Sequence, residues 1–301
     1  MNSTFVKEES YLIVGREGRL AAALLKNASR HLNKELVFNI SARNLEIEFI
    51  LSKILPSQTL NIIWSSGWAG ARSDKETCNE DFKLFSLFID RLFNLKCNHL
   101  NFIFLSSGGT IYGNSPGSVT ENSPVNPNSY YAEMKLRSEE LLLSKLSNKL
   151  TPLILRLANL YGSNLATSKT SLIDECISNF PKRNPFSIFT NLASQKQYGT
   201  FQDYSMSILE STKLVSAGMN QNRVLNLFPP HLYSVKEILE ITSKYFDLEW
   251  KKLLGNLLND LPLETTILKN ADGITQPSMI WESISSYLEK IGLQGAESKI
   301  K

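Results

Sequence analysis

The sequence is poor in cysteine and histidine, with three of each among 301 residues. They are Cys78, Cys97, Cys176, His31, His99 and His231. No CxxC pair or other cluster forms among them, which excludes a zinc site and a disulfide framework. A lone cysteine is far more often a small core residue than a nucleophile. We therefore expect no metal and a reduced, cytoplasmic setting.

Long apolar runs and dense runs of charge are also missing. No apolar stretch approaches the about 18–20 residues that a membrane span needs, and the start lacks the basic-then-apolar pattern of a signal peptide. The net charge is only +3, from 32 basic and 29 acidic residues spread along the chain. No segment is basic enough for a nucleic-acid or anionic-membrane footprint. With 42% hydrophobic residues, the composition is that of an ordinary soluble globular protein.

The most informative stretch runs from residue 101 to residue 135. It begins with a short apolar run, Phe102 to Leu105, which predicts a buried strand. Ser106 and Ser107 follow, where a strand that carries functional groups would end. After a loop rich in Pro, Asn and Ser, a helical segment begins near Tyr131.

Tyr131 and Lys135 lie four residues apart, so a helix places them on one face. An ammonium near a phenol favours the phenolate and lowers the pKa of the tyrosine. Such a phenol can give a proton to a carbonyl oxygen or take one from a carbinol. The spacing alone is weak, because it also describes a half-buried tyrosine beside a lysine whose stem lies along the surface.

The surrounding motifs make the signal specific. Residues 106–113 read Ser-Ser-Gly-Gly-Thr-Ile-Tyr-Gly, followed by Glu121, Pro124 and Pro127 and then by the Tyr131/Lys135 helix. This order resembles the extended short-chain dehydrogenase/reductase family, in its branch of nucleotide-sugar epimerases, dehydratases and reductases. The resemblance implies an α/β fold with a Rossmann-like, doubly wound parallel sheet and a smaller C-terminal substrate-binding subdomain. It also implies that Tyr131 transfers a proton and that Lys135 holds the nicotinamide ribose.

One departure from the family pattern concerns catalysis. The family's catalytic Ser or Thr lies four residues before the tyrosine of the Tyr-Gly pair, where this chain has Gly108. Glycine has no hydroxyl to offer the reacting oxygen. The nearest hydroxyls belong to Ser107 and Thr110, and the sequence favours them equally.

A strand–turn–helix pattern near the start predicts a dinucleotide site. The apolar run Tyr11 to Val14 precedes Gly15 and Gly18 in a GxxGxxA turn, and a helical pattern follows. Such glycines allow the backbone to approach a pyrophosphate at a helix N-terminus. A second loop, with Trp64 and Trp68, falls where relatives pass beneath the cofactor; the tryptophans either stack there or pack in the core. We assign to the cofactor Gly15, Arg16, Gly18, Arg19, Leu20, Ser65, Ser106, Tyr131 and Lys135.

The choice between NAD and NADP is argued from the second strand, predicted at residues 35–38. NAD-binding relatives place a carboxylate at its end for the ribose hydroxyls. This chain has Asn39, Ser41 and Arg43 instead, without a carboxylate. Arg16 and Arg43 are suited to a 2′-phosphate, which favours NADP(H).

The second half of the chain resembles the family at fewer positions. A strand at 152–157 leads into Asn159, which matches a family residue that contacts the sugar-nucleotide. Residues 1–162 are predicted to form the NAD(P)-binding domain, and 163–301 mainly the substrate subdomain, with some segments returning to the sheet. Gln197 stands where the family has an arginine that clamps the diphosphate, and Lys196 is the candidate substitute.

Two functions follow from these patterns. The first is an NAD(P)-dependent oxidoreductase or epimerase of a nucleotide-activated sugar, in deoxysugar or surface-polysaccharide biosynthesis. The apolar residues Leu141–Leu143 permit a homodimer through the Tyr131 helix, as in many relatives. The alternative is a non-catalytic NAD(P)-binding regulatory or scaffold protein, which Gly108, Gln197 and Met134 motivate and the Tyr131/Lys135 pair opposes.

Overall fold

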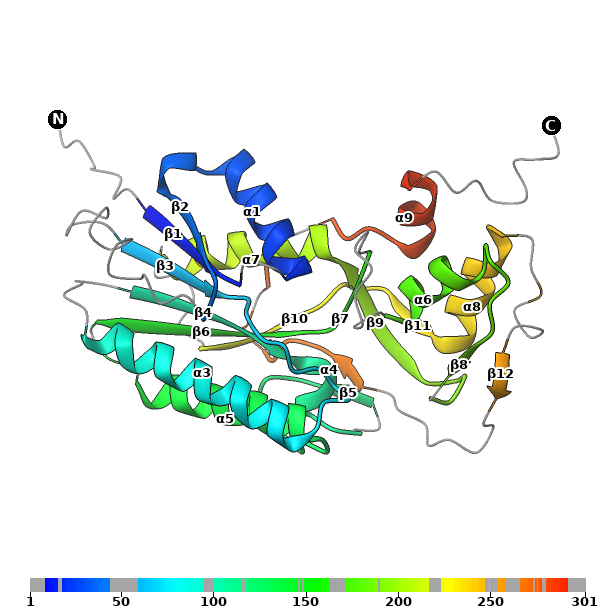
Figure 1. Cartoon of the computed structure of the whole chain (residues 1–301), viewed down its shortest axis with the longest axis horizontal. Helices are drawn as coiled ribbons and strands as arrows, with labels where there is room; N and C mark the ends of the chain where they lie inside the picture. Colours follow the sequence, from blue (N-terminus) through cyan, green and yellow to red (C-terminus); the bar gives the residue numbers. More distant parts are fainter. Residues whose placement is uncertain are drawn as a thin grey trace.

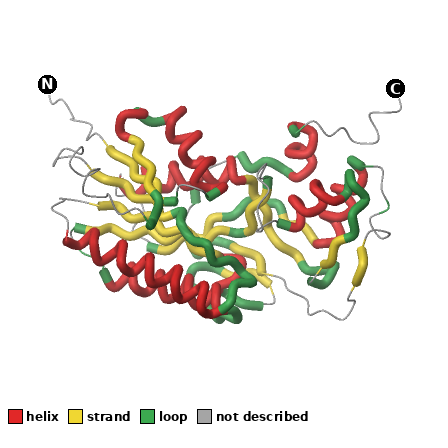
Figure 2. The backbone as a smooth tube through the Cα atoms, viewed as in Figure 1, coloured by secondary structure: helices red, strands yellow, loops and turns green. Residues whose placement is uncertain are grey.

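The computed structural model describes two lobes, a large sheet covered by helices and a smaller group of short strands and helices (Figure 1). The described residues are 9–15, 18–43, 59–94, 100–114, 117–145, 147, 149–162, 171–188, 190–216, 223–246, 249, 254–257, 266–272, 274, 276–277 and 280–291. Arg16, assigned to the cofactor from the sequence, lies outside them. Figure 2 shows helices on both sides of the large sheet.

The large sheet has six strands in the order β10-β6-β4-β3-β1-β2, and every neighbouring pair is parallel. Its members are β1 (Glu9–Val14), β2 (Val37–Ile40), β3 (Thr59–Trp64), β4 (Leu100–Ser107), β6 (Leu150–Leu157) and β10 (Val224–Leu227). Strand β10 comes from the second half of the chain and completes the edge beyond β6. The predicted Rossmann-like parallel sheet is confirmed.

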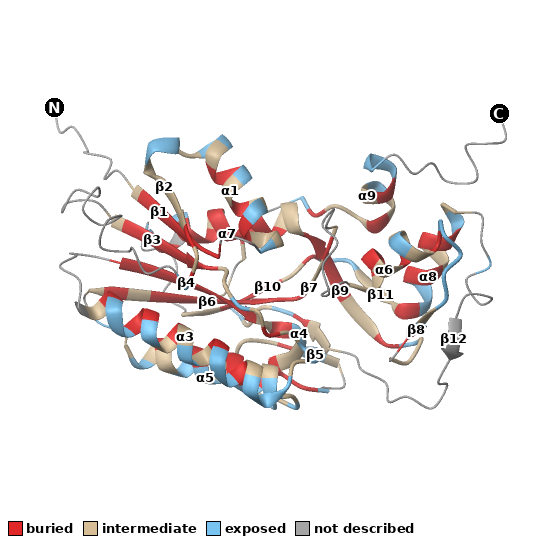
Figure 3. Cartoon of the chain, in the orientation of Figure 1, coloured by how far each residue is buried: buried red, intermediate tan, exposed pale blue. Residues whose placement is uncertain are grey.

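The strands of the large sheet contribute side chains to two hydrophobic cores, one on each face, because successive side chains point to opposite faces of a sheet. In β1, Tyr11 and Ile13 belong to one buried cluster, whereas Leu12 and Val14 belong to the other. The first cluster includes residues of the helices α1 (Arg19–His31) and α7 (Phe201–Ser216); the second includes residues of α3 (Lys75–Asn94) and α5 (Tyr130–Ser144). Figure 3 shows the central strands largely buried and the outer faces of α1, α3 and α5 exposed.

The smaller lobe is built on a second sheet in the order β11-β9-β7. Its elements are β7 (Asn159–Tyr161), β9 (Gln195–Thr200), β11 (Leu232–Ser234), the pair β8 (Phe186–Ile188) and β12 (Leu254–Leu257), and the helices α6 (Leu172–Asn179), α8 (Val235–Lys244) and α9 (Ile284–Lys290). Helix α8 begins with a capping box, in which Ser234 and Glu237 satisfy each other's backbone N–H groups. A further parallel pair joins β5 (Gly117–Val119) to β13 (Thr266–Leu268).

The second strand begins later than the sequence predicts. Residues Lys34–Leu36 form a 3-10 turn, η1, because the side chain of Asn33 accepts a hydrogen bond from the Glu35 N–H. The strand therefore covers Val37–Ile40 rather than 35–38.

Candidate active site

The carboxyl ends of β1 and β3 form the point at which a parallel sheet of this kind binds its ligand. The chain passes from β1 to β2 on one side and then to β3 on the other, so the direction of winding reverses at β1. Gly15 follows β1 with φ of 132°, and a Cβ there would lie 2.8 Å from the carbonyl oxygen of Ser65. Only glycine allows the two loops to approach so closely.

The N-terminus of α1 is suited to a pyrophosphate. Gly18 caps this helix without a side-chain hydrogen bond, and its first turn contains no acidic residue. The N–H groups of the first turn and the positive end of the helix dipole therefore favour an anion. The Arg19 guanidinium stacks over Phe201 at 4.9 Å from the ring centroid and lies 3.7 Å from the Asp174 carboxylate. Leu20 packs against the core.

Tyr131, Lys135 and Ser107 meet at the end of β4. Tyr131 and Lys135 lie one turn apart on α5, and Ser107 shares a side-chain hydrogen bond with Tyr131. The Lys135 ammonium donates a hydrogen bond of 2.9 Å to the carbonyl oxygen of Leu105 and lies 5.7 Å from the centroid of the Tyr131 ring. The structure thus brings together three of the four residues that the sequence singled out for catalysis.

The expected lowering of the Tyr131 pKa is wrong for this arrangement. Burial raises the pKa of Tyr131, the carboxylate of Asp81 raises it further, and only the hydrogen bond to Ser107 opposes them. Burial also lowers the pKa of Lys135, against the attraction of Asp81 and Glu139. The ammonium is directed at a backbone carbonyl rather than at the phenol, so it does little for the phenolate.

Gly108 begins the short helix α4 (Gly108–Ile111), and the space beside it is filled from a distant part of the chain. A Cβ at Gly108 would lie 2.5 Å from Cδ1 of Leu268 and 3.1 Å from the carbonyl oxygen of Arg156. Leu268, in β13, is itself buried. A hydroxyl-bearing side chain at position 108 would therefore need Leu268 to move.

The fourth candidate, Thr110, is placed differently from Ser107. Its Oγ1 atom is buried and has no hydrogen-bond partner within the described part of the chain. A buried hydroxyl without a partner is costly, so Thr110 has a donor and an acceptor to offer a bound molecule.

Gln197 fixes the position of Leu268 by binding its backbone. Its amide nitrogen donates to the Leu268 carbonyl at 3.2 Å, and its amide oxygen accepts from the Leu268 N–H at 2.9 Å. Asn159 donates to the backbone carbonyl of Gln197 at 3.1 Å. Gln197 is buried and bonded to the Leu268 backbone, whereas the neighbouring Lys196 is partly exposed.

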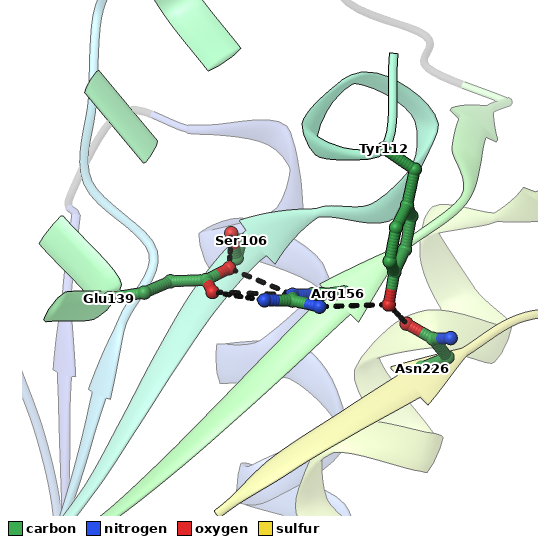
Figure 4. Close-up of polar contacts among 5 residues, drawn as sticks. All are labelled: Ser106, Tyr112, Glu139, Arg156 and Asn226. Atoms are coloured by element: carbon green, nitrogen blue, oxygen red, sulfur yellow. Dashed lines mark hydrogen bonds and ion pairs between the residues drawn. The ribbon is translucent and has the colours of Figure 1, made fainter. Parts of the chain in front are cut away.

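A buried ion pair attaches α5 to the sheet (Figure 4). Arg156 in β6 donates to both oxygens of Glu139 in α5, at 2.7 Å for the shortest contact. Ser106 also donates to Glu139, and Arg156 donates to the hydroxyl of Tyr112, which donates to Asn226 in β10. The hydroxyl of Ser106, assigned to the cofactor from the sequence, is therefore engaged with Glu139.

The network continues to the segment after β13 through Glu121. One carboxylate oxygen of Glu121 accepts from the N–H of Asn226 and from the side chain of Asn270, both at 2.7 Å. The other accepts from the N–H of Ala271 at 2.8 Å. The Glu…Pro loop noted in the sequence thus ties the segment beyond Leu268 to the central sheet.

The two tryptophans at the end of β3 and in the loop after it have different environments. Trp64 is buried among Phe85, Phe88 and Phe102, so its role is packing. Trp68 is partly exposed, and the Arg43 guanidinium lies 4.9 Å from the centroid of its ring. Arg43 follows β2, so this cation lies beside the ends of β2 and β3.

Several important residues were missed by reasoning from the sequence. Glu139 offered a usable signal, since it lies four residues after Lys135 on the same helix face. Asp81, Arg156 as a partner of Glu139, and Leu268 beside Gly108 carry no such signal, because their contacts join distant segments.

The fold and the site define a dinucleotide-binding α/β protein with a Tyr-x-x-x-Lys helix beside its switch point. The model of the NAD dependent epimerase/dehydratase family matches residues 47–226. This chain belongs to that family. A search of curated protein sequences finds no match. Within the described residues, no helix is long and apolar enough to cross a membrane, and no group of three metal-ligating side chains forms.

Solved structures share the fold over nearly the whole chain. MoeE5 in complex with UDP-glucose and NAD has a TM-score of 0.73 at 16% identity, covering 93% of this chain and 97% of that one. UDP-glucuronic acid 4-epimerase from Bacillus cereus, with a fluorinated UDP-glucuronic acid and NAD, gives 0.70 at 18%, covering 93% and 96%. UDP-glucose 4-epimerase from Thermotoga maritima gives 0.69 at 14%, covering 97% and 100%. At these identities the likeness establishes the fold.

The buried ion pair gives a first stability prediction. Replacing Glu139 with Gln leaves the Arg156 guanidinium buried without its counter-ion, and we expect a loss of about 3–5 kcal/mol in the free energy of unfolding. Denaturant titration measures it. Asp90→Asn is the control, because Asp90 forms an exposed pair with Lys145, and its loss should cost less than about 1 kcal/mol. Equal, small effects of the two changes would contradict the role of the pair.

The filled space beside Gly108 gives a second prediction. Gly108→Ala forces Leu268 aside, and we expect a cost of about 1–3 kcal/mol from overpacking. Gly109→Ala in the same helix is the matched control, because the nearest atom to its added Cβ is 3.7 Å away; it should be neutral or stabilising by up to about 1 kcal/mol. The same titration compares them, and equal stability of the Gly108→Ala and Gly109→Ala variants would refute the packing argument.

Proposed function

We propose that this chain is an NAD(P)-dependent enzyme of nucleotide-activated sugars, which reduces a 4-keto sugar or epimerises C4. The observation that carries the proposal is the Ser107–Tyr131 hydrogen bond with Lys135 one helical turn away, at the end of a central strand. The setting is deoxysugar or surface-polysaccharide biosynthesis in the cytoplasm, as the family resemblance implies.

The cofactor site is assigned to the first two loops of the large sheet. Gly15, Gly18 and the N-terminus of α1 would hold the pyrophosphate, and Lys135 would hold the nicotinamide ribose. The nicotinamide supplies or accepts the hydride when bound.

The proton is assigned to Tyr131. Its raised pKa keeps the phenol protonated at neutral pH, so it is set to donate to a carbonyl oxygen in the reductive direction. Ser107 supports the phenolate that remains, since its hydrogen bond favours the charged form. Thr110, with its buried hydroxyl, is the second candidate to contact the reacting oxygen.

The substrate is assigned to the smaller lobe, where it adjoins the large sheet. Asn159 and Lys196 lie on β7 and β9, which pair with each other. Several structural neighbours were solved in complex with UDP-sugars. Because Gln197 replaces the arginine clamp and is buried, Lys196 would meet the diphosphate as a point charge.

The second part of the proposal is a preference for NADP(H). The neighbours were crystallised with NAD, but the end of β2 in this chain offers no carboxylate for the ribose hydroxyls. Arg43 lies there, beside the Trp68 ring. A guanidinium beside the adenosine ribose favours a 2′-phosphate.

A non-catalytic NAD(P)-binding protein is the second candidate. Leu268 fills the space beside Gly108, and Gln197 is turned inward. Position 108 therefore carries no hydroxyl, and the side chain at 197 is engaged with the Leu268 backbone. This candidate predicts cofactor binding without turnover.

The decisive experiment compares the wild type with Tyr131→Phe. One sample of the purified protein is denatured, and the small molecules that it releases are identified by mass spectrometry. Turnover by the native protein is followed separately on a panel of UDP- and dTDP-linked sugars and their 4-keto forms. Loss of the phenol should reduce turnover about a hundredfold to ten-thousandfold, with cofactor affinity retained. Retained NAD indicates an epimerase, and free exchange of NADPH indicates a reductase. A wild type that binds cofactor but turns over no sugar would support the non-catalytic candidate.

Cofactor preference is tested separately with Arg43→Ala. We expect the affinity for NADPH to fall about tenfold to a hundredfold, with the affinity for NADH nearly unchanged, because only NADPH carries the 2′-phosphate. Titration by intrinsic tryptophan fluorescence measures both. Arg137→Ala is the control, since Arg137 also stacks on an aromatic ring, Phe82 at 4.1 Å, but on the α3/α5 side. Equal losses for NADH and NADPH would refute the preference.

A further inference from the structure

The first residue of α1 makes contacts that join the two lobes. Arg19 begins the helix whose N-terminus is assigned to the cofactor pyrophosphate. Its guanidinium lies over the ring of Phe201, 4.9 Å from the centroid. Phe201 begins α7 directly after β9, so it lies where the chain returns from the smaller lobe to the large sheet. Figure 1 shows the start of α7 near the N-terminal end of α1.

The same guanidinium reaches a carboxylate of the smaller lobe. Its Nη1 atom lies 3.7 Å from Oδ2 of Asp174 in α6, and the two side chains are only 18% and 7% exposed. Solvent and salt screen such a pair less than an exposed pair, and the desolvated carboxylate needs a counter-charge. This contact is therefore worth more than the exposed pair of Lys145 with Asp90.

Asp174 is itself fixed at the entrance to the smaller lobe. Its Oδ1 atom accepts a hydrogen bond of 2.9 Å from the N–H of Gly162, the residue that follows β7. Its Oδ2 atom and its own N–H form, with Ser171, the capping box that begins α6. Arg19 thus contacts the smaller lobe at two places, near the point where the chain enters it and near the point where the chain returns.

We propose that Asp174 is a positioning residue: through Arg19 it fixes the smaller lobe against the first turn of α1, so that the dinucleotide site and the smaller lobe are coupled. The inference rests on the proposed function for the identity of the two ligands. Its physical content, an ion pair between two lobes of the folded chain, does not.

A dinucleotide at the N-terminus of α1 would act on the helical turn that carries Arg19. A bound pyrophosphate fixes the N–H groups of such a turn. Ordering this turn for one ligand removes part of the ordering cost that the smaller lobe otherwise pays for the other. Binding of the dinucleotide and binding of a nucleotide sugar should therefore favour each other, and this coupling is reciprocal.

The first test needs no ligand. Denaturant titration compares the wild type with Arg19→Gln, Asp174→Asn and the double variant; the asparagine keeps an oxygen to accept the Gly162 N–H and loses the charge. If the two side chains interact, the double variant should be more stable than the two single losses together predict, by about fivefold or more in the ratio of folded to unfolded protein.

A matched cycle controls for the loss of a capping carboxylate. It pairs Arg19→Gln with Glu237→Gln, because Glu237 has the same place in the capping box of α8 that Asp174 has in α6. The effects in this cycle should be additive. Additive effects in the Arg19/Asp174 cycle as well would overturn the inference.

The second test follows the coupling in the folded protein by hydrogen exchange, with and without saturating NADPH or NADH. In the wild type the cofactor should slow amide exchange in α6 as well as in α1, by about fivefold or more. In Asp174→Asn the slowing should persist in α1 and be lost from α6, whereas in Glu237→Gln it should persist in both helices.

The outcomes separate the inference from the proposed function. Equal slowing of α6 in the wild type and in Asp174→Asn overturns the inference, and so does a wild type in which α1 responds and α6 does not. If neither cofactor slows exchange in α1 while the Arg19/Asp174 cycle is non-additive, the contact between the lobes stands and the proposed function is rejected instead.

Discussion

The ion pair between Arg156 and Glu139 is the interaction on which the site depends. It joins β6 to α5 in the interior, and its remaining hydrogen bonds are made by Ser106 from β4 and by Tyr112, which leads to Asn226 in β10. A buried pair of this kind requires every donor and acceptor to be satisfied. Satisfying them fixes α5 against three neighbouring strands, so that Tyr131 and Lys135, on the same helix, are held at the end of β4.

The region around Gly108 departs from the family pattern that the sequence resembles in a coordinated way. Gly108 lacks a side chain, Leu268 fills the space, and Gln197 binds the backbone of Leu268 with both ends of its amide. Glu121 then secures the segment just beyond it. Each of the three residues 108, 197 and 268 makes sense only with the others, because a larger residue at 108 would displace Leu268 and an arginine at 197 could not accept the Leu268 N–H. The three residues therefore form one packing arrangement, although residues 108 and 197 taken singly each lack a group that the family pattern has.

The pKa values of the pair are set by burial and by neighbouring charges. Burial lowers the pKa of Lys135, and the carboxylates of Asp81 and Glu139 oppose that change. Tyr131 is partly buried, near a carboxylate, and hydrogen-bonded to Ser107. The resulting electrostatics keep Tyr131 protonated, whereas the Tyr-x-x-x-Lys spacing alone had suggested a phenol that ionises easily.

The sequence by itself determined several elements of the first half of the chain and their order. The apolar run before Gly15, the strand that ends at Ser106 and Ser107, and the helix with Tyr131 and Lys135 all stand where local patterns predict them. Such patterns depend on neighbours a few residues apart, which is why they can be read from the chain. Only the tertiary structure decided what lies beside the pair. Arg156 and Leu268 reach the site from segments remote in sequence, and packing across those distances sets the space at Gly108 and anchors α5 to the sheet.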